Sequence, residues 1–226
     1  MAYRIWYNPP GNSISWSMNW VDGDRTKVSV IDRERDGGTQ IGVSFVSSFG
    51  CGRPIKPDFL PSQMTATKAI KKIPDIFNRG GGSKVVTQKF RDIVESFEPN
   101  VHQFFPVDLV TKAKKHIETI YIFIVCNRID SVHPDKNENW IFREEYCRWV
   151  RRSKDRSLSV DERKFWKEHD PGRGRLILHR AKIGQRHVWV EKHISGQVNR
   201  FYSNQLAGAL MEAELHHVSF FENGEC

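Results

Sequence analysis

The sequence has no hydrophobic run long enough to cross a membrane. Its longest uninterrupted apolar run is the seven residues from Ile120 to Cys126, whereas a membrane-spanning helix needs about 20. The N-terminus reaches Pro9-Pro10-Gly11 without an apolar core of the length that a signal peptide has. We therefore expect a soluble, cytoplasmic protein without a membrane partner.

Cysteine is scarce and follows no metal-binding or redox spacing. The four cysteines are Cys51, Cys126, Cys147 and Cys226. No two are close enough for a metal knuckle or a Cys-x-x-Cys pair. Scattered thiols of this kind indicate a reducing compartment, and we expect neither a disulfide framework nor a structural zinc site.

Catalytic signatures are also missing. The nine histidines include no His-Glu-x-x-His motif, and the adjacent pair His216-His217 would point to opposite faces of a strand. No Gly-x-Ser-x-Gly elbow occurs. The glycine-rich stretch from Arg79 to Lys84 lacks the P-loop order and is interpreted as a flexible loop. We expect a protein that is not an enzyme and holds no metal or cofactor.

Aromatic residues and positive charge are plentiful. Seven Trp and fourteen Phe among 226 residues exclude a disordered chain. The net charge of +8 is concentrated in residues 143–186, which hold 14 basic and 7 acidic residues, while the remainder holds 21 and 20. A clustered positive surface attracts an anionic partner, either nucleic acid or an acidic protein. The segment could equally be a solvated helical face.

Residues 1–80 are predicted to form a strand-rich part of the protein. Ile14, Trp16, Met18 and Trp20 alternate with polar residues, which is typical of a strand with one buried face. The predicted strands are Tyr3–Tyr7, Ile14–Trp20, Val28–Ile31 and Gln40–Val46, and a short helix is predicted over Thr65–Ile73.

Two segments 116 residues apart share one pattern of strand, helix and strand. The first has a strand at Val85-Val86, a cap at Thr87 and a strand over Val101–Val107, and the helix stops at Pro99. Its apolar helix face is Phe90, Ile93, Val94 and Phe97. The second copy has a strand at Phe201-Tyr202, a cap at Ser203, a face of Leu206, Ala209, Leu210 and Ala213, and a strand over Val218–Phe221. We expect both units to pack on a common sheet.

Between the two units, Ile120–Cys126 is predicted to be a central strand buried on both faces. Helices are predicted over Asn139–Lys154 and after the capping box Ser159-x-x-Glu162, and strands over Leu176–His179 and His187–Val190. The predicted fold class is α+β, a mixed, mainly antiparallel sheet with short helices. Residues 1–80 and 83–226 are expected to form one compact unit, with a basic helical insert at about 139–175.

The same stretches resemble the immunity 11 family. Val85 to Phe97 and Val101 to Val107 resemble its central helix and following strand, and Tyr121 to Asp130 resembles its next strand. Phe201 to Leu210 and Val218 to Phe221 are similar to its C-terminal helix and final strand. The resemblance covers roughly residues 83 to 221, and the charged stretch from Asn139 to Arg175 is longer and more basic than the family pattern.

The resemblance implies a non-enzymatic antitoxin that binds a cognate toxin of a polymorphic toxin system, often one delivered by type VI secretion or by cell contact, and so serves in bacterial competition. The basic segment implies an acidic contact surface on that toxin. Because Trp and Arg dominate binding hot spots, the candidate toxin-binding residues are Arg148, Trp149, Arg151, Arg152, Arg156 and Trp166. The alternative is a nucleic-acid-binding protein that uses residues 143–186, although no signature of such a protein is visible.

Overall fold

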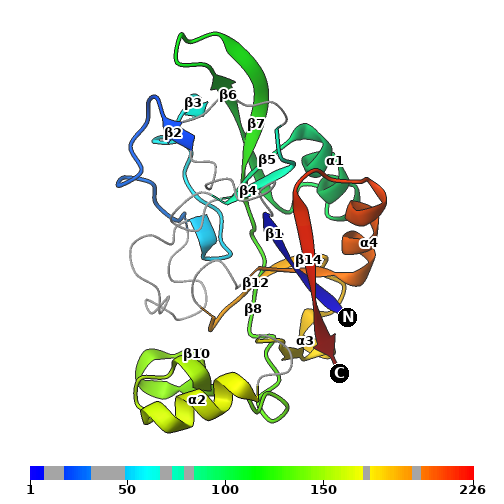
Figure 1. The fold of residues 1–226 in the computed structure, drawn as a ribbon. Coiled ribbons are helices and arrows are strands. Elements are labelled where there is room, and N and C mark those ends of the chain that lie inside the picture. The colour runs from blue at the N-terminus through cyan, green and yellow to red at the C-terminus, as the bar shows by residue number, and fades with distance from the viewer. Residues whose placement is uncertain (8–17, 32–48, 67–72, 79–83, 170–173, 195–199) are drawn as a thin grey trace.

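The computed structural model describes residues 1–7, 18–31, 49–66, 73–78, 84–169, 174–194 and 200–226. Its strands form two six-stranded sheets and one two-stranded sheet (Figure 1). The first sheet contains β11 (Ile177–Leu178), β14 (Val218–Glu225), β1 (Ala2–Tyr7), β13 (Arg200–Ser203), β12 (Val188–Glu191) and β8 (Arg128–Ile129), in that order. The second contains β2 (Met18–Trp20), β3 (Gln63–Ala66), β6 (Gln103–Val110), β7 (His116–Ile124), β5 (Lys84–Val86) and β4 (Ile76–Asn78). The small sheet pairs β10 (Arg148–Arg151) with β9 (Trp140–Arg143).

The helices are short and lie beside the sheets. The α-helices are α1 (Gln88–Phe97), α2 (Val160–Glu168), α3 (Arg180–Ile183) and α4 (Asn204–Glu212). Two 3₁₀ turns, η2 (Glu144–Tyr146) and η3 (Arg152–Lys154), flank β10. Most strand pairs are antiparallel, and three are parallel. The predicted α+β class is therefore confirmed.

The repeated pattern is real, and it extends further than the sequence indicated. In the second sheet β5 and β6 flank β7, and both run antiparallel to it, while α1 connects them. In the first sheet β13 and β14 flank β1 in the same way, and α4 connects them. The next strands also correspond, because β4 and β12 pair antiparallel with β5 and β13, while β3 and β11 pair parallel with β6 and β14. Each unit is thus a five-stranded arrangement with the same strand order and directions.

The strand register supports this equivalence. Ile5 lies opposite Phe220, Phe123 lies opposite Phe104, and positions 104 and 220 are 116 residues apart. The central strand comes from different places in the chain, since β7 follows β6 but β1 is supplied by the N-terminus. The expectation of a common sheet was wrong, because each unit completes a sheet of its own.

The two units meet through their helices, which lie side by side in Figure 1. One apolar cluster holds Phe90 and Val94 from α1, Leu206 and Leu210 from α4, and residues of both large sheets, among them Phe123. Burying these faces drives the helices onto the sheets, since apolar burial is worth about 25 cal/mol per Å². The prediction that β7 is a buried central strand is confirmed, although the strand ends at Ile124.

The two helix caps differ although their positions are equivalent. The Ser203 hydroxyl accepts a hydrogen bond from Leu206 N (3.2 Å) and caps α4 as predicted. Thr87 precedes α1, but its hydroxyl donates to the Asp75 carboxylate (2.5 Å) and makes no cap bond. Asp75 is buried, and a buried carboxylate needs donors. The predicted role of the Thr87 hydroxyl was therefore wrong.

Two predicted helices also need correction. Thr65-Ala66, the start of one, belongs to β3, which pairs with β2 and β6. Asn139–Lys154 forms the β9–β10 hairpin, where Trp149 faces Phe142 across the strands. Its β-branched and aromatic residues favour such cross-strand pairs over a helix.

The remaining N-terminal predictions have mixed outcomes. The strand over Tyr3–Tyr7 is confirmed as β1. Met18–Trp20 is a strand, and residues 14–17 of the same prediction lie outside the described part. The interval 28–31 contributes a single bridge, Val30 to Ile55. Predictions for residues 40–46, 67–72 and 79–83 fall outside the described residues.

Candidate functional site

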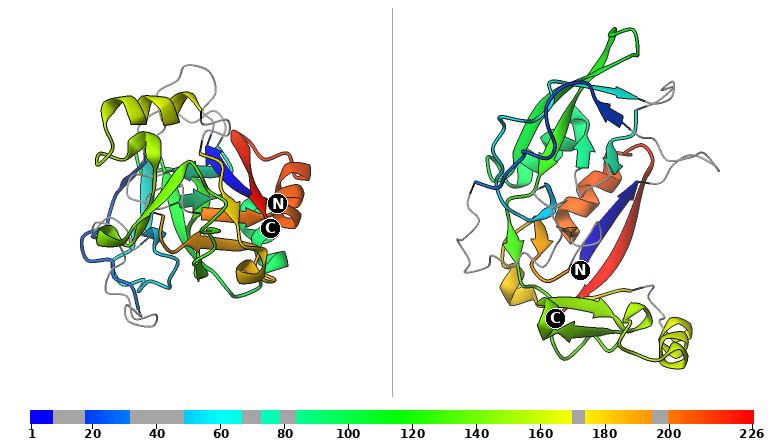
Figure 2. Two further views of the ribbon diagram at one scale, coloured as in Figure 1. Left: turned by 90° about the horizontal axis from the view of Figure 1, so that it is seen from below. Right: turned by 90° about the vertical axis from the view of Figure 1, so that its left-hand side faces the viewer.

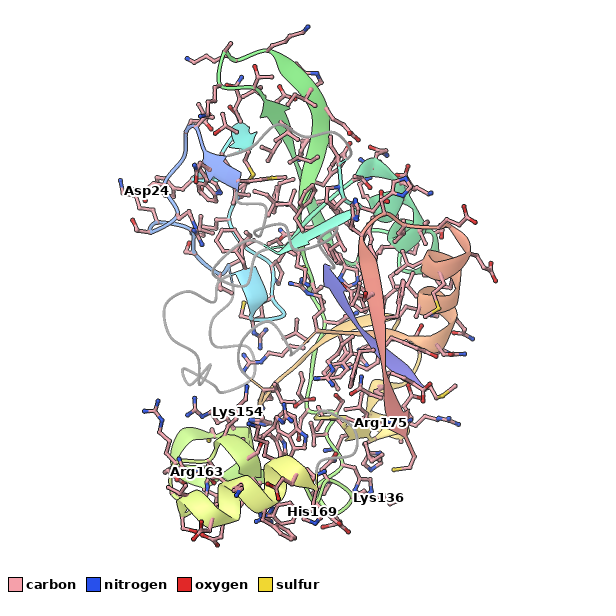
Figure 3. All side chains as sticks on the ribbon, in the orientation of Figure 1. Asp24, Lys136, Lys154, Arg163, His169 and Arg175 are labelled. Carbon is pink, nitrogen blue, oxygen red and sulfur yellow. The ribbon has the colours of Figure 1, made fainter. Side chains whose placement is uncertain are left out.

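Much of the basic segment forms a lobe at one end of the molecule (Figure 2). We define the lobe as residues 139–169, which comprise β9, η2, β10, η3 and α2. These residues include nine Lys or Arg and six Asp or Glu. Figure 3 shows Lys154, Arg163 and His169 on the lobe, with Lys136 and Arg175 nearby. Positive charge therefore gathers at this end of the molecule.

An ion pair and a capping box hold the lobe together. Arg143 Nε donates to the carboxylate of buried Asp155 (2.8 Å), which also accepts from Ser157 N (3.0 Å). Burial alone would raise the pKa of Asp155, but the bonds from Ser157 and the charge of Arg143 outweigh it and lower the pKa. The Ser159 and Glu162 side chains close the predicted capping box at the start of α2.

His193 joins the lobe to the body of the protein. Its Nδ1 lies 3.0 Å from Cys147 O, and its carbonyl accepts from Trp149 N (2.7 Å). The ring of Phe142 packs edge-on against His193 (5.3 Å between centroids). Nearby Trp140 is buried in a cluster with residues of the first sheet. The lobe is therefore anchored by apolar contacts and backbone hydrogen bonds.

The six predicted binding residues all lie on the lobe, but the structure separates their roles. Trp149 packs on Phe142 (5.4 Å) and on a buried cluster, so much of its surface serves the core. Arg148 and Arg151 are half-buried strand residues, and the Arg151 side chain passes close to Gly174. Arg156 is exposed.

Arg152 and Trp166 form a pair between η3 and α2. The Arg152 guanidinium lies 5.1 Å from the centroid of the Trp166 ring, and its Nε donates to Glu138 O (2.8 Å). Such a cation–π contact holds both side chains in place. This pair tethers α2 to the hairpin.

Sequence reasoning missed the apolar surface of α2. No residue of α2 is buried, and Val160 and Phe165 are 69% and 50% exposed. The Phe165 ring stacks on His169 (4.1 Å) and meets Trp166 edge-on (5.4 Å). Exposed aromatic residues beside basic ones are typical of protein interfaces. The helical hydrophobic pattern could not reveal this surface, because it does not say which face is covered.

A hollow of about 650 Å³ lies beside the C-terminal end of the basic segment (residues 143–186). It is enclosed by α3, the end of α1 and the start of α4. Arg180, Arg186 and His187 line it. His187 is held by Ser203 Oγ (2.8 Å) and by the edge of Phe97 (4.9 Å). Arg180 pairs with Glu225 (3.4 Å), which also lines the hollow, and Arg186 Nη1 donates to Ile183 O (3.1 Å).

Neither a metal centre nor a membrane helix emerges from the described residues. In the described ranges no group of three or more His, Cys, Asp or Glu is placed to hold a metal ion. None of the helices described is long and apolar enough to span a membrane.

The fold and the basic surface define an α+β protein built from two equivalent units, with a projecting lobe. A family model matches most of this architecture: the immunity protein family (Imm11) matches residues 52–225, and the chain belongs to that family. The match includes the lobe and both strand–helix–strand segments, β5–α1–β6 and β13–α4–β14. It begins after β1, the central strand of the first sheet. No curated protein matches the chain.

Proposed function

We propose that the protein is a non-enzymatic immunity protein that binds a cognate toxin domain in the cytoplasm and neutralises it by direct contact. The observation that carries this proposal is the family match over residues 52–225. The proposed setting is competition between bacteria, with a toxin delivered by type VI secretion or by cell contact.

The basic lobe is the proposed toxin-binding surface. It presents exposed aromatic and basic side chains, among them Phe165 on α2, a helix that has no buried residue, and Arg156 in the segment before α2. Trp166, Arg152 and the half-buried Arg148 and Arg151 support this surface, while Trp149 fixes it to the body. A stable complex would bury about 1,600 Å² or more. The excess of positive charge favours an acidic toxin surface.

The experiment is co-expression with the toxin domain encoded in the neighbouring reading frame. The wild-type chain is expected to protect cells and to co-purify as a one-to-one complex. Arg156→Glu, Lys164→Glu and Lys167→Glu together change three exposed lobe residues. We expect this variant to weaken binding at least tenfold, about 1.4 kcal/mol, because like charges would face each other.

A matched control reverses the charge of three exposed lysines at the opposite end of the molecule. Lys112→Glu, Lys114→Glu and Lys115→Glu lie in the β6–β7 turn, far from the lobe in Figure 1. Binding of this variant should be close to wild type. Equal loss in both variants would contradict the placement of the interface, whereas failure of the wild-type chain to bind would contradict the function.

Nucleic acid is the competing partner for the same surface. Titrations of the purified protein with DNA and RNA at 50 and 200 mM salt separate the two functions. A nucleic-acid-binding protein would lose affinity steeply across this range. We expect no salt-dependent binding to either.

A further inference from the structure

Two rows of side chains with opposite charge run along the exposed side of α2. Each row holds three exposed residues at i, i+4 and i+7, which are Val160, Lys164 and Lys167 in the first row and Asp161, Phe165 and Glu168 in the second. Residues at this spacing share one face of a helix, and the two rows are neighbours because they differ by one residue. Arg163 and Trp166 lie on the other side, where both are half-buried. The helix therefore packs on the lobe through one side and presents both rows to a partner.

The Phe165 ring is held in place although half of the residue is exposed. It stacks on His169 (4.1 Å between centroids) and meets the edge of Trp166 (5.4 Å). Trp166 is fixed in turn by the Arg152 guanidinium, 5.1 Å from its centroid. Because the ring is already ordered, covering it costs little conformational entropy. An ordered, exposed aromatic side chain of this kind is suited to be the anchor of an interface.

The charges beside Phe165 are negative, although the lobe as a whole is basic. Asp161 lies one turn before Phe165, and Glu168 lies one turn after it. In the part of the chain that the structure describes, neither carboxylate forms an ion pair. Both are therefore available to a partner, and complementary interfaces place basic groups opposite such carboxylates.

We propose that Phe165 inserts into an apolar socket on the toxin, and that basic groups on the rim of this socket meet Asp161 and Glu168. This inference rests on the proposed function, because it takes the toxin as the partner of the lobe. It goes further by dividing the toxin surface into a basic rim beside the second row and an acidic area opposite Lys164 and Lys167. Adjacent rows of opposite charge fix the orientation of the partner, since any other orientation brings like charges together.

The first test is the double variant Asp161→Lys, Glu168→Lys, titrated against the purified toxin domain by calorimetry. These changes make the lobe more basic, so attraction by net charge alone predicts tighter binding. The proposed socket predicts binding that is weaker by at least about tenfold. The helix should persist, because a lysine is unfavourable in the first turn but favourable in the last. The control Asp58→Lys, Glu212→Lys adds the same charge at exposed positions outside the lobe and should bind like the wild type.

The second test removes the aromatic anchor. Phe165→Ala should weaken toxin binding at least about 30-fold, the effect of truncating a hot-spot residue. Its Tm should stay close to that of the wild type, because no residue of α2 is buried. Phe59→Ala is the matched control: Phe59 is also exposed, and its carbonyl accepts from Asp24 N (2.9 Å), away from the lobe in Figure 3.

The outcomes separate this inference from the function on which it rests. A wild-type chain that does not bind the toxin would contradict the function and the inference together. If the wild type binds but the Asp161→Lys, Glu168→Lys variant binds as tightly or more tightly, the inference is overturned while the function stands. Sedimentation of the protein alone examines the other possible occupant. A dimer that Phe165→Ala dissociates would assign this face to a second copy of the chain and would also overturn the inference.

Discussion

Glu191, the last residue of β12, should make the protein less stable as the pH rises towards neutrality. Its carboxylate is 1% exposed and accepts from Ser131 N (2.6 Å), Ser131 Oγ (2.5 Å) and His193 N (3.2 Å). Burial outweighs these bonds and raises the pKa of Glu191 from 4.5 to about 7. The folded protein therefore keeps a proton that the unfolded chain releases.

The sign follows from linkage between protonation and folding. Below pH 4.5 both states hold the proton, and the contribution of Glu191 to the free energy of unfolding is largest. Between pH 4.5 and about 7 only the unfolded chain loses it, so stability falls. One pH unit corresponds to about 1.4 kcal/mol, and the total loss is about 3 kcal/mol.

Glu191→Gln tests this reasoning, because the amide resembles the protonated carboxyl but does not titrate. The variant should match the wild type near pH 4.5 and exceed its free energy of unfolding by about 3 kcal/mol at pH 8. Urea unfolding followed by Trp fluorescence at several pH values measures the difference. Glu168→Gln, at an exposed glutamate, is the control. A difference between Glu191→Gln and wild type that stays constant from pH 4.5 to 8 would refute the reasoning.

Four further substitutions test the caps, a turn and the lobe. Ser203→Ala should lower the free energy of unfolding by about 1 kcal/mol through loss of a cap. Thr87→Val should lower it by about 1–3 kcal/mol, because the buried Asp75 carboxylate loses one donor and keeps His216 N as the other. Urea unfolding should show the smaller loss for Ser203→Ala. Gly23→Ala should lower Tm by several degrees, since φ is +77° and the new Cβ would lie 2.8 Å from a backbone oxygen; an unchanged Tm would contradict this. His193→Ala removes the contact with Cys147 O, and hydrogen exchange should accelerate in residues 139–169 but not in α4; uniform exchange would argue against the anchor.

Short-range patterns in the sequence were reliable where a segment is packed by its own apolar face. The 116-residue repeat predicted α1 and α4 because Phe90, Val94, Leu206 and Leu210 recur at helical spacing. The Ser159 capping box predicted the start of α2, because a cap depends on groups within one turn.

The same kind of pattern failed where a distant partner competes for a group. The aromatic spacing in Asn139–Lys154 fits a helix, yet pairing of Phe142 with Trp149 makes a hairpin. Thr87 is a favourable cap residue, yet its hydroxyl donates to Asp75 and makes no cap bond. Which partner a side chain contacts is fixed only when distant segments come together in the folded chain.

The sequence by itself determined the α+β class, the two repeated units, the concentration of positive charge in residues 143–186 and the resemblance to an immunity family. These are properties of local spacing and composition. Tertiary structure alone decided that each unit completes its own sheet, that the N-terminal strand β1 fills the place of β7, and that Lys84 and Arg200 are buried together. The reason is physical: strand partners and buried charges are selected by contacts between segments far apart in the chain, which residue spacing does not encode.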